Sequence, residues 1–396
     1  MRIAIVHDWL TGHRGGERVL ERLLSLWPSA DLFTLFHARG SVPESIESRK
    51  PRTSWLQHVP GLRSHYRLAL PLFPHAIESL DLRGFDAVIA SSHCVAHGVR
   101  TDARATKLAL IYSPARYAWD LEDEYLTAHP ARLVARPLLA AFRDWDRRAA
   151  QGPHSLIAIS QHVAQRVRRH WNRDAVVVHP GIALARFAGV RSGGEHYLVL
   201  GALTPGKRAH VAIEACAQLG RPLIVAGEGP LAGSLRRIAP RDCRFLGAVA
   251  ESDVPGHYAN ARALLFPGVE DFGLVPIEAM AAGCPVIALA QGGALESVGR
   301  ERGANAERAL AEHRLSAVAG GVLFADSGAA ALAAAIRAFE SCAFESDTVR
   351  LAAAPFSHEQ FDRAFLAAVR AVPGGDALVA AAAISPDSAR VPVATS

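Results

Sequence analysis

Short apolar runs alternate with segments of helical periodicity along most of the chain. Runs such as RIAIVHDWL at residues 2–10 and YLVLGAL at residues 197–203 have the length and composition of buried strands. The segment at residues 16–27 places apolar side chains every three or four positions, as an amphipathic helix does. Such alternation is typical of α/β folds built on parallel sheets. We therefore predict a doubly wound α/β architecture.

The strand and helix pattern restarts after VVVHPGI, which predicts two consecutive doubly wound domains of ordinary size. We place the first Rossmann-like domain at residues 1–180 and the second at residues 181–355. Residues 356–372 are expected to form a last helix that packs back on the first domain. Residues 373–396 are rich in Ala, Gly, Ser and Pro, so we predict a disordered tail there.

Composition excludes several classes of protein. Of the 396 residues, 50% are hydrophobic and 20% are charged, which supplies enough apolar material for two cores and excludes wholesale disorder. The sequence has no uninterrupted apolar run of the roughly 18 residues that a membrane-spanning helix needs. The five cysteines are scattered and form no C-x-x-C pair, so neither a zinc knuckle nor a disulfide framework is encoded. We expect a cytoplasmic protein.

The net charge of +5 is unevenly distributed. Residues 1–190 hold 25 Lys and Arg against 17 Asp and Glu, whereas the remaining residues hold 18 against 21. A basic first half indicates an anionic partner. Residues 49–75 interleave Arg and His with aromatic residues and prolines, which suits contact with an anionic membrane surface or a lipid diphosphate. An ordinary Arg-rich surface is the alternative. No recognisable reading motif indicates a nucleic acid partner.

A glycine-containing turn in the first domain is a candidate anion site. The turn TGHRGGE at residues 11–17 lies between the first predicted strand and its helix. Backbone N–H groups near Gly15 and Gly16, together with the helix N-terminus, favour a diphosphate or a carboxylate. A tight turn that needs glycine only for its geometry is the alternative.

The equivalent turn of the second domain, GALTPGKRAH, carries two cations. It holds Lys207, one of only three lysines beside forty arginines in this chain, and Arg208 follows directly. Both side chains are placed to reach a diphosphate at the next helix N-terminus. A solvated basic turn is the alternative. After the following strand, AGEGPLAG does not fit the dinucleotide-binding fingerprint, but Gly227 and Gly229 would let a nucleotide approach the backbone closely.

Two glutamates eight residues apart are the strongest chemical signal. Glu270 precedes the turn Asp271-Phe272-Gly273, and Glu278 lies in the short helix that follows. Both therefore belong at the carboxyl edge of the second sheet, where open α/β sheets bind ligands. Two carboxylates at that edge suit the acceptance of hydrogen bonds from vicinal sugar hydroxyls. Surface glutamates at a helix start are the alternative.

The segment EDFGLVPIEAMAAGCPVIAL closely resembles the E-x(7)-E signature of family-4 retaining glycosyltransferases. That resemblance implies the GT-B fold, in which two Rossmann-like domains face a central cleft. It extends over nearly the whole chain, because further blocks follow in the family's order: IVHDWLTGHRGGERVLE, SPARYAWD, AISQHVAQRV, VVHPGI, GKRAHVAIEA and AGEGP. The first two blocks look most like bacterial mannosyltransferases of O-antigen and exopolysaccharide assembly.

The resemblance assigns the donor site mainly to the second domain. By matching positions, Glu278 is expected to hold the ribose hydroxyls, and Glu270 is expected to face the sugar hydroxyls and the diphosphate. Lys207 would neutralise the diphosphate. The family usually has an Arg five residues before this lysine, where this chain has Ala202, and Arg208 is the candidate substitute. Backbone groups complete the expected donor site at Gly15, Gly16, Gly227, Gly229, Phe272, Gly273 and Leu274.

The resemblance also implies how the first domain takes part. His93 matches a histidine that lies close to the transferring sugar in many relatives, and nearby His97 competes for this role. In SPARYAWD, the acceptor-side candidates are Arg116, Tyr117 and Trp119. The favoured retaining route uses an oxygen of the leaving diphosphate to accept the acceptor's proton, so it needs no protein nucleophile.

No metal or other cofactor is expected beside the donor. A D-x-D motif marks the other large glycosyltransferase fold, where it binds a metal. The only D-x-D here, at residues 144–146, lies in a helix-like segment, and we interpret it as a solvated helix face.

The sequence thus predicts a retaining glycosyltransferase that transfers mannose from GDP-mannose to a lipid-linked oligosaccharide or polysaccharide precursor. We expect peripheral contact with the cytoplasmic face of the inner membrane. The alternatives are a UDP-sugar donor, a sugar-nucleotide epimerase, a dehydrogenase, and a non-catalytic partner that only binds a sugar nucleotide. The absent G-x-G-x-x-G motif and the two glutamates argue against the epimerase and the dehydrogenase.

Overall fold

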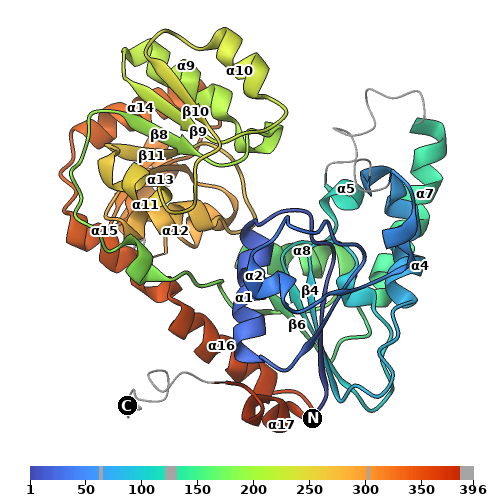
Figure 1. Cartoon of the computed structure of the whole chain (residues 1–396). Helices are drawn as coiled ribbons and strands as arrows, with labels where there is room; N and C mark the ends of the chain where they lie inside the picture. The colour runs from blue at the N-terminus through green and yellow to red at the C-terminus, as the bar shows by residue number, and fades with distance from the viewer. Residues whose placement is uncertain (62–65, 121–131, 301–303, 384–396) are drawn as a thin grey trace, which may run out of the picture. The chain divides into compact units, whose positions relative to one another are not determined.

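The computed structural model describes residues 1–61, 66–120, 132–300 and 304–383 (Figure 1). The chain divides into two compact units. The N-terminal unit contains Met1–Pro180 and the C-terminal segment from Phe361, and the second unit contains Gly181–Gln360.

The N-terminal unit is built on a seven-stranded sheet in the order β3-β2-β1-β4-β5-β6-β7. Every neighbouring pair in this sheet is parallel. The central strands are buried along their whole length, which is why they read as continuous apolar runs in the sequence. The strands are β1 (Ile3–His7), β2 (Asp31–Thr34), β3 (Arg52–Thr53), β4 (Ala87–Ser92), β5 (Thr106–Ile111), β6 (Ser155–Ala158) and β7 (Val176–Val177).

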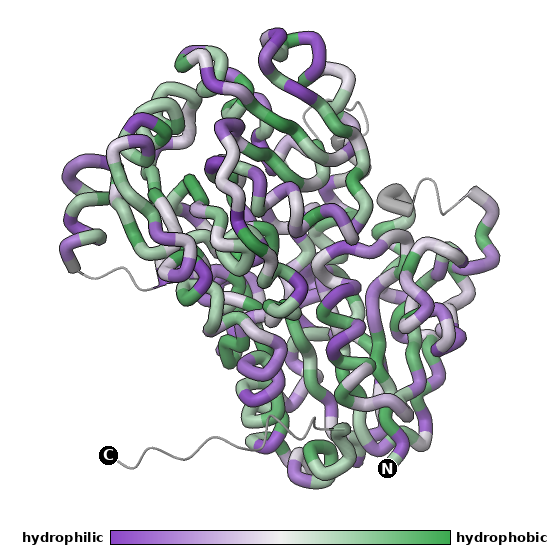
Figure 2. The backbone as a smooth tube through the Cα atoms, turned by 60° about the vertical axis from the view of Figure 1, so that its left-hand side comes forward, coloured by the Kyte–Doolittle hydropathy of each residue, from purple (hydrophilic) through white to green (hydrophobic). Residues whose placement is uncertain are grey.

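Helices connect these parallel strands, as crossover connections require. The predicted amphipathic helix is α1, which buries its apolar stripe together with Glu17 and leaves its other charged residues at least partly exposed. In Figure 2, hydrophobic and hydrophilic residues alternate along the helical turns, as expected for helices with one buried face. The helices are α1 (Gly15–Leu26), α2 (Glu44–Glu47), α4 (Phe73–Glu78), α5 (Arg116–Trp119), α7 (Arg132–Ala149) and α8 (Gln161–Trp171), with 3-10 turns η1 (Trp55–His58), η2 (Tyr66–Leu72) and η3 (Ala96–Gly98).

The C-terminal segment forms two helices, α16 (His358–Arg370) and α17 (Gly375–Ala380). The Arg22 guanidinium forms an ion pair with the nearly buried Asp362 of α16. Trp27 Nε1 donates to the Leu378 carbonyl oxygen in α17 at 3.0 Å. The predicted disordered tail is therefore wrong for residues 375–380, because this short Ala-rich stretch buries Leu378 and is ordered by packing. Residues 384–396 of the predicted tail lie outside the described residues.

The second unit has a seven-stranded sheet in the order β10-β9-β8-β11-β12-β14-β13. It is parallel except at the edge, where β13 pairs with β14 in antiparallel fashion. Only Ala319 and Gly320 separate these two strands, and so short a connection permits only antiparallel pairing. The strands are β8 (Tyr197–Leu200), β9 (Leu223–Ala226), β10 (Cys243–Gly247), β11 (Ala263–Phe266), β12 (Val286–Leu289), β13 (Leu315–Val318) and β14 (Gly321–Phe324).

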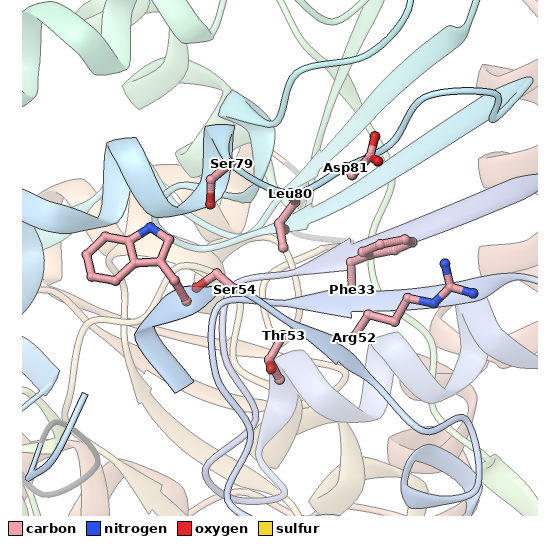
Figure 3. Close-up of a pocket in the computed structure, with 8 residues that line it drawn as sticks. Phe33, Arg52, Thr53, Ser54, Ser79, Leu80 and Asp81 are labelled. Carbon is pink, nitrogen blue, oxygen red and sulfur yellow. The ribbon is translucent and has the colours of Figure 1, made fainter. Parts of the chain in front are cut away.

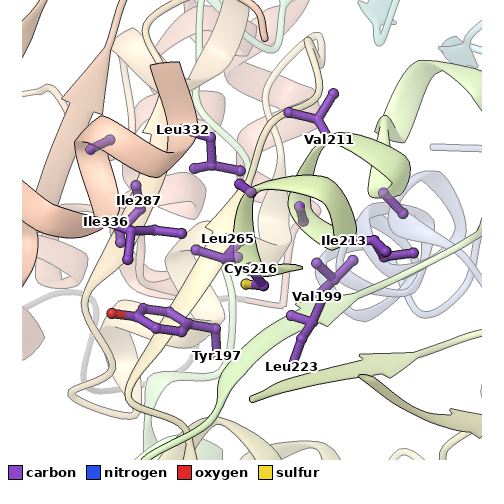
Figure 4. Packing of buried hydrophobic residues seen from close by; sticks show 14 of the residues in the cluster. Tyr197, Val199, Val211, Ile213, Cys216, Leu223, Leu265, Ile287, Leu332 and Ile336 are labelled. Atoms are coloured by element: carbon purple, nitrogen blue, oxygen red, sulfur yellow. The ribbon is translucent and has the colours of Figure 1, made fainter. Parts of the chain in front are cut away.

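The core of the second unit joins this sheet to α9 and α14. Figure 4 shows side chains of this core, with Tyr197 and Val199 from β8 among branched aliphatic residues of the neighbouring elements. The helices are α9 (Ala209–Leu219), α10 (Ala232–Ile238), α11 (Val254–Asn260), α12 (Leu274–Ala281), α13 (Ala304–His313), α14 (Ala329–Glu340) and α15 (Ser346–Ala353), with 3-10 turns η4 (Leu184–Phe187), η5 (Pro205–Lys207), η6 (Gly292–Leu295) and η7 (Ala354–Phe356).

The predicted α/β architecture with two doubly wound sheets is confirmed, the second sheet being parallel except at β13. Within the described ranges, no helix combines the length and the apolar character needed to cross a membrane.

Candidate active site

In the second unit, the loops at the carboxyl edge of the sheet pack backbone against backbone. A Cβ on Gly227 would overlap the carbonyl oxygen of Gly201, and a Cβ on Gly229 would lie 2.5 Å from the Leu203 carbonyl oxygen. The turn after β9 therefore rests directly on the turn after β8. The need for glycine at these two predicted donor-site positions is explained by contact within the chain.

Lys207 and Glu270 meet at this edge. Lys207 ends η5 after β8, whereas Glu270 follows β11, the neighbouring strand in the sheet. Lys207 Nζ donates to Glu270 Oε1 and forms an ion pair with it. The side chains are 30% and 19% exposed, so both remain within reach of a ligand. The structure thus brings together the cation and the carboxylate that the sequence singled out separately.

Glu278 is held more deeply than Glu270. It lies on α12 and is 2% exposed, and its Oε2 accepts a hydrogen bond from the Tyr258 hydroxyl at 3.0 Å. Tyr258, on α11, is itself fully buried. A buried carboxylate needs such a partner, because removing an ionised group from water is costly unless it is hydrogen-bonded. Tyr258 therefore fixes Glu278 in place.

The N-terminus of α12 brings three further predicted positions together. Gly273 precedes the helix with a positive φ of 85°, which glycine adopts readily, and Leu274 is the first helical residue. The Phe272 side chain is buried, and its ring centroid lies 5.7 Å from that of Phe356. The first backbone N–H groups of a helix have no partner within it, so this end of α12 favours an anion.

Arg208 is partly committed elsewhere. Its backbone is left-handed with φ of 53°, and its Nη2 donates to the Ser327 carbonyl oxygen at 2.8 Å. Ala202, five residues before Lys207, carries no charge. Lys207 is therefore the cation of this turn that pairs with Glu270. The Arg208 side chain instead contacts the loop after β14.

In the N-terminal unit, one carboxylate organises the carboxyl edge of the sheet. Asp8 directly follows β1 and is completely buried. Its two oxygens accept four successive backbone N–H groups, those of residues 93–96, at 2.6–2.9 Å. The same carboxylate lies 3.1 Å from Nδ1 of His93. The loop after β4 is therefore wrapped around the Asp8 side chain.

His93 is the partly accessible histidine of this loop. Its side chain is 27% exposed, whereas that of His97 is completely buried. Desolvation lowers the pKa of His93 below its usual range, although the Asp8 charge acts in the opposite direction. Desolvation therefore favours the neutral form of the ring. His97 is enclosed instead, with Nδ1 3.1 Å from Ser92 Oγ and Nε2 3.2 Å from Asp146 Oδ1.

A second polar network holds the start of α1 against the sheet. His7 Nδ1 is hydrogen-bonded to Ser91 Oγ at 2.9 Å, and Ser91 Oγ to the Tyr112 hydroxyl at 2.9 Å. The Tyr112 hydroxyl donates to the Gly16 carbonyl oxygen at 3.2 Å. Burial alone would raise the pKa of Glu17, but its interactions with His7, 3.8 Å away, lower it to about 2. The predicted turn at Gly15 and Gly16 is thus fixed by buried side chains.

The acceptor-side candidates lie on α5. Arg116 and Tyr117 are partly exposed. The Trp119 ring stacks on His170 with centroids 4.6 Å apart, and its Nε1 donates to Asp146 Oδ2 at 2.7 Å. The structure therefore gives Trp119 a packing role, although it is partly exposed like the other two candidates.

The interpretation of residues 144–146 as a solvated helix face is wrong for Asp146. This residue of α7 is completely buried and also accepts a hydrogen bond from Trp171 Nε1 at 2.6 Å. Both indole N–H groups donate to its Oδ2, whereas His97 Nε2 lies 3.2 Å from its Oδ1. Asp144 lies on the outer side, where it pairs with Arg147.

The N-terminal unit also has a hollow of about 450 Å³ over the edge strand β3. Trp55 is among the residues that line it, and in Figure 3 Phe33 and Arg52 lie together on one side. None of the predicted site residues lines this hollow, so it takes no part in the candidate site.

Sequence reasoning missed two residues of this site. Asp8 carries a signal, because an acidic residue directly after a buried strand lies at the edge where ligands bind. Tyr258 carries none, since no spacing links it to Glu278, twenty residues further along the chain. Both act on predicted residues through contacts that only the folded chain creates.

Residues 194–340 match the family model described as Glycosyl transferases group 1, so the chain carries a domain of this family. The match contains Lys207, Glu270 and Glu278. It confirms the predicted resemblance to glycosyltransferases, while family 4 and O-antigen assembly remain predictions.

Relatives in sequence are named as mannosyltransferases. A GDP-mannose-dependent alpha-(1-6)-phosphatidylinositol monomannoside mannosyltransferase of Mycobacterium tuberculosis is 30% identical over 227 residues, which is 49% of this chain and 58% of that protein. A phosphatidyl-myo-inositol mannosyltransferase of Propionibacterium freudenreichii is 30% identical over 41% of this chain and 47% of that protein. The chain spans about half the length of the curated relatives it matches.

Solved structures confirm the GT-B fold. Anabaena HepE in complex with UDP is similar with a TM-score of 0.66 and 17% identity, over 94% of this chain and all of that one. WaaG, a glycosyltransferase involved in lipopolysaccharide biosynthesis, is similar with a TM-score of 0.58 and 18% identity, also over 94% of this chain and all of that one.

Proposed function

We propose that this protein is a retaining glycosyltransferase that transfers mannose from GDP-mannose to a lipid-linked glycan precursor. The observation that carries the proposal is the pairing of Lys207 with Glu270 at the carboxyl edge of the second unit, inside the matched domain. The donor is proposed from the names of the mannosyltransferase relatives in Mycobacterium and Propionibacterium.

In the proposed mechanism, the donor diphosphate replaces Glu270 as the partner of Lys207. The first N–H groups of α12 add partial positive charge. Glu270 is then free to accept hydrogen bonds from the sugar hydroxyls, and Glu278 holds the ribose hydroxyls. Stabilising charge on the departing diphosphate is the main contribution of the protein, and preorganised groups do this better than water.

The acceptor is proposed to be lipid-linked and to bind the N-terminal unit. The basic excess over residues 1–190 supports this, as do Arg116 and Tyr117, which follow β5, the strand that pairs with β4 before the His93 loop. Exposed apolar side chains on the same unit, Trp55, Leu72 and Leu138, suit contact with a membrane surface. Co-sedimentation with vesicles tests this part, and equal binding to anionic and neutral vesicles would contradict it.

The donor is tested first by binding. GDP-mannose should raise the melting temperature of the protein, because a ligand that binds only the folded state stabilises it by mass action. UDP-glucose, UDP-galactose and UDP-GlcNAc serve as competing donors. A larger shift with any of these would replace GDP-mannose by that donor and leave the proposed reaction class intact.

The site is tested by transfer of radiolabelled mannose to a lipid extract. Lys207→Ala and Glu270→Ala should each lower the rate about 10²-fold, the usual cost of removing one charge-stabilising group. Arg186→Ala is the matched control, because Arg186 forms a surface ion pair with Glu251 in the same unit. A loss of less than tenfold in either site variant would contradict the assignment.

A further inference from the structure

The loop after β4 is held at both ends by buried acidic residues. At its start, Asp8 accepts the N–H groups of residues 93–96. At its end, His97 lies between Ser92 and Asp146 and is completely buried. Four backbone donors that converge on one carboxylate leave this stretch little freedom, since a loop that moved would expose several unsatisfied groups at once. Within the loop, His93 is the side chain that stays partly exposed.

Asp8 also faces the His93 ring. The distance from Asp8 Oδ2 to His93 Nδ1 is 3.1 Å. An ionised carboxylate offers only lone pairs, so a lone pair on Nδ1 would be repelled at this distance, whereas an N–H would be attracted. The proton of the neutral ring therefore belongs on Nδ1, and Nε2 keeps the lone pair. Free histidine in water prefers the opposite tautomer.

Packing fixes the plane of the ring as well. The Trp9 and His93 rings meet edge to face, with centroids 4.3 Å apart and an interplanar angle of 83°. The His7 ring lies 5.7 Å from His93 on centroids and is itself hydrogen-bonded to Ser91. Asp8 and Trp9 are consecutive in the chain, and both lie against the His93 ring. Asp8 lies at its Nδ1 side, and Trp9 meets the ring edge to face.

We propose that Asp8 is a positioning residue that holds His93 as the Nδ1–H tautomer and so presents Nε2 as a hydrogen-bond acceptor for a hydroxyl of the bound sugar. This inference rests on the proposed function, because it takes His93 to lie beside the transferring sugar. Asp8 itself is completely buried, so its role is indirect. It acts by fixing both the backbone of the His93 loop and the proton of the ring.

The tautomer is measured first, without any substrate, by long-range proton–nitrogen NMR of the wild-type protein labelled with ¹⁵N-histidine. The His93 signals are assigned with His93→Gln. We expect Nδ1 to be protonated and Nε2 to be unprotonated at pH 7.5. A proton on Nε2 would overturn the proposal, whether or not the protein transfers mannose. In Asp8→Asn, the preference for Nδ1–H should be lost.

Transfer kinetics then test the positioning role. Asp8→Asn should lower kcat about 10²-fold with little change in the KM for the donor, since misplacing a reacting group costs that much. The double variant Asp8→Asn/His93→Gln should be no slower than His93→Gln alone, because both changes remove one interaction. Additive losses would overturn the proposal.

Asp102→Asn is the matched control, since Asp102 also accepts a backbone N–H, that of Gly84 at 2.8 Å. It should leave the His93 spectrum and kcat unchanged. If Asp8→Asn fails to fold, the wild-type tautomer alone decides. A protein with the predicted tautomer but no transferase activity would refute the proposed function and leave the assigned ring state standing.

Discussion

The carboxyl edges of the two sheets are built in different ways. In the N-terminal unit, buried polar side chains hold the edge together, with Asp8 accepting four backbone N–H groups and Glu17 lying against His7. In the second unit, glycines let the loops touch backbone to backbone, and the polar residues Lys207 and Glu270 stay partly exposed. The first edge therefore depends on buried polar and charged side chains, whereas the second depends on glycines, which have none. Different substitutions should therefore disrupt the two edges.

The largest combined effect on stability and transfer is expected from Gly293→Ala in the second unit. A Cβ on Gly293 would overlap the Cα and the carbonyl oxygen of Phe272, so the turn that carries Glu270 must move. We expect a loss of roughly 1–3 kcal/mol in the free energy of unfolding, as for an overpacked core. Transfer should fall about 10²-fold, because a shift of about 1 Å in a catalytic group costs that much. Urea unfolding and mannose transfer measure the two effects.

Gly206→Ala is the control for this variant. Gly206 lies in the Lys207 turn, but no atom would lie within 4 Å of its added Cβ. Its stability should stay within about 0.5 kcal/mol of the wild type, as for most surface substitutions. If Gly206→Ala and Gly293→Ala lost equal stability, close backbone contact would not be what shapes this edge.

Much of the fold follows from the sequence because buried parallel strands are apolar throughout. The runs that became β1, β4 and β5 are buried at every position, so their pattern survives without any tertiary information. Several of the strands that the sequence did not indicate are short or lie at the edge. β3 and β7 have two residues each and are partly exposed, so they leave almost no pattern. The antiparallel edge strand β13 is separated from β14 by a turn of two residues.

The residues of the candidate site likewise divide into those that the sequence indicates and those that only the fold reveals. Glu270, Glu278 and Lys207 could be found because they lie in or directly after turns that carry a recognisable motif. Asp146 could not be placed, since a charged residue on a helix is usually solvated, and only the fold brings two indole N–H groups and His97 to it. The roles of Asp8 and Tyr258 likewise depend on partners that are distant in sequence.

The second prediction concerns acid stability of the N-terminal edge. The pKa of Glu17 is about 2 in the folded protein, below its usual value of 4.5. A carboxyl whose pKa is lowered on folding contributes stability above pH 4.5, and this contribution is lost as the pH falls towards 2. Glu17→Gln should therefore cost on the order of 3 kcal/mol at pH 7 and flatten the fall in stability between pH 4.5 and pH 3. Urea unfolding at several pH values measures this, with exposed Glu44→Gln as the control. A variant curve parallel to that of the wild type would contradict the role given to this pair.

The smallest effects compare one tyrosine from each edge. Tyr112→Phe removes the hydroxyl that donates to the Gly16 carbonyl oxygen, and a hydrogen bond between neutral groups contributes about 1 kcal/mol. Tyr258→Phe removes the donor to Glu278, and hydrogen bonds to charged groups contribute roughly 1.5–3 kcal/mol. Urea unfolding should therefore show the larger loss for Tyr258→Phe. Because burial raises the pKa of Tyr112 above its usual range, its phenol remains a donor at neutral pH, and its loss should not vary between pH 6 and pH 8. A larger loss for Tyr112→Phe would mean that a neutral hydrogen bond at the first edge contributes more than a bond to a carboxylate at the second, so that the charge of the acceptor does not decide these contributions.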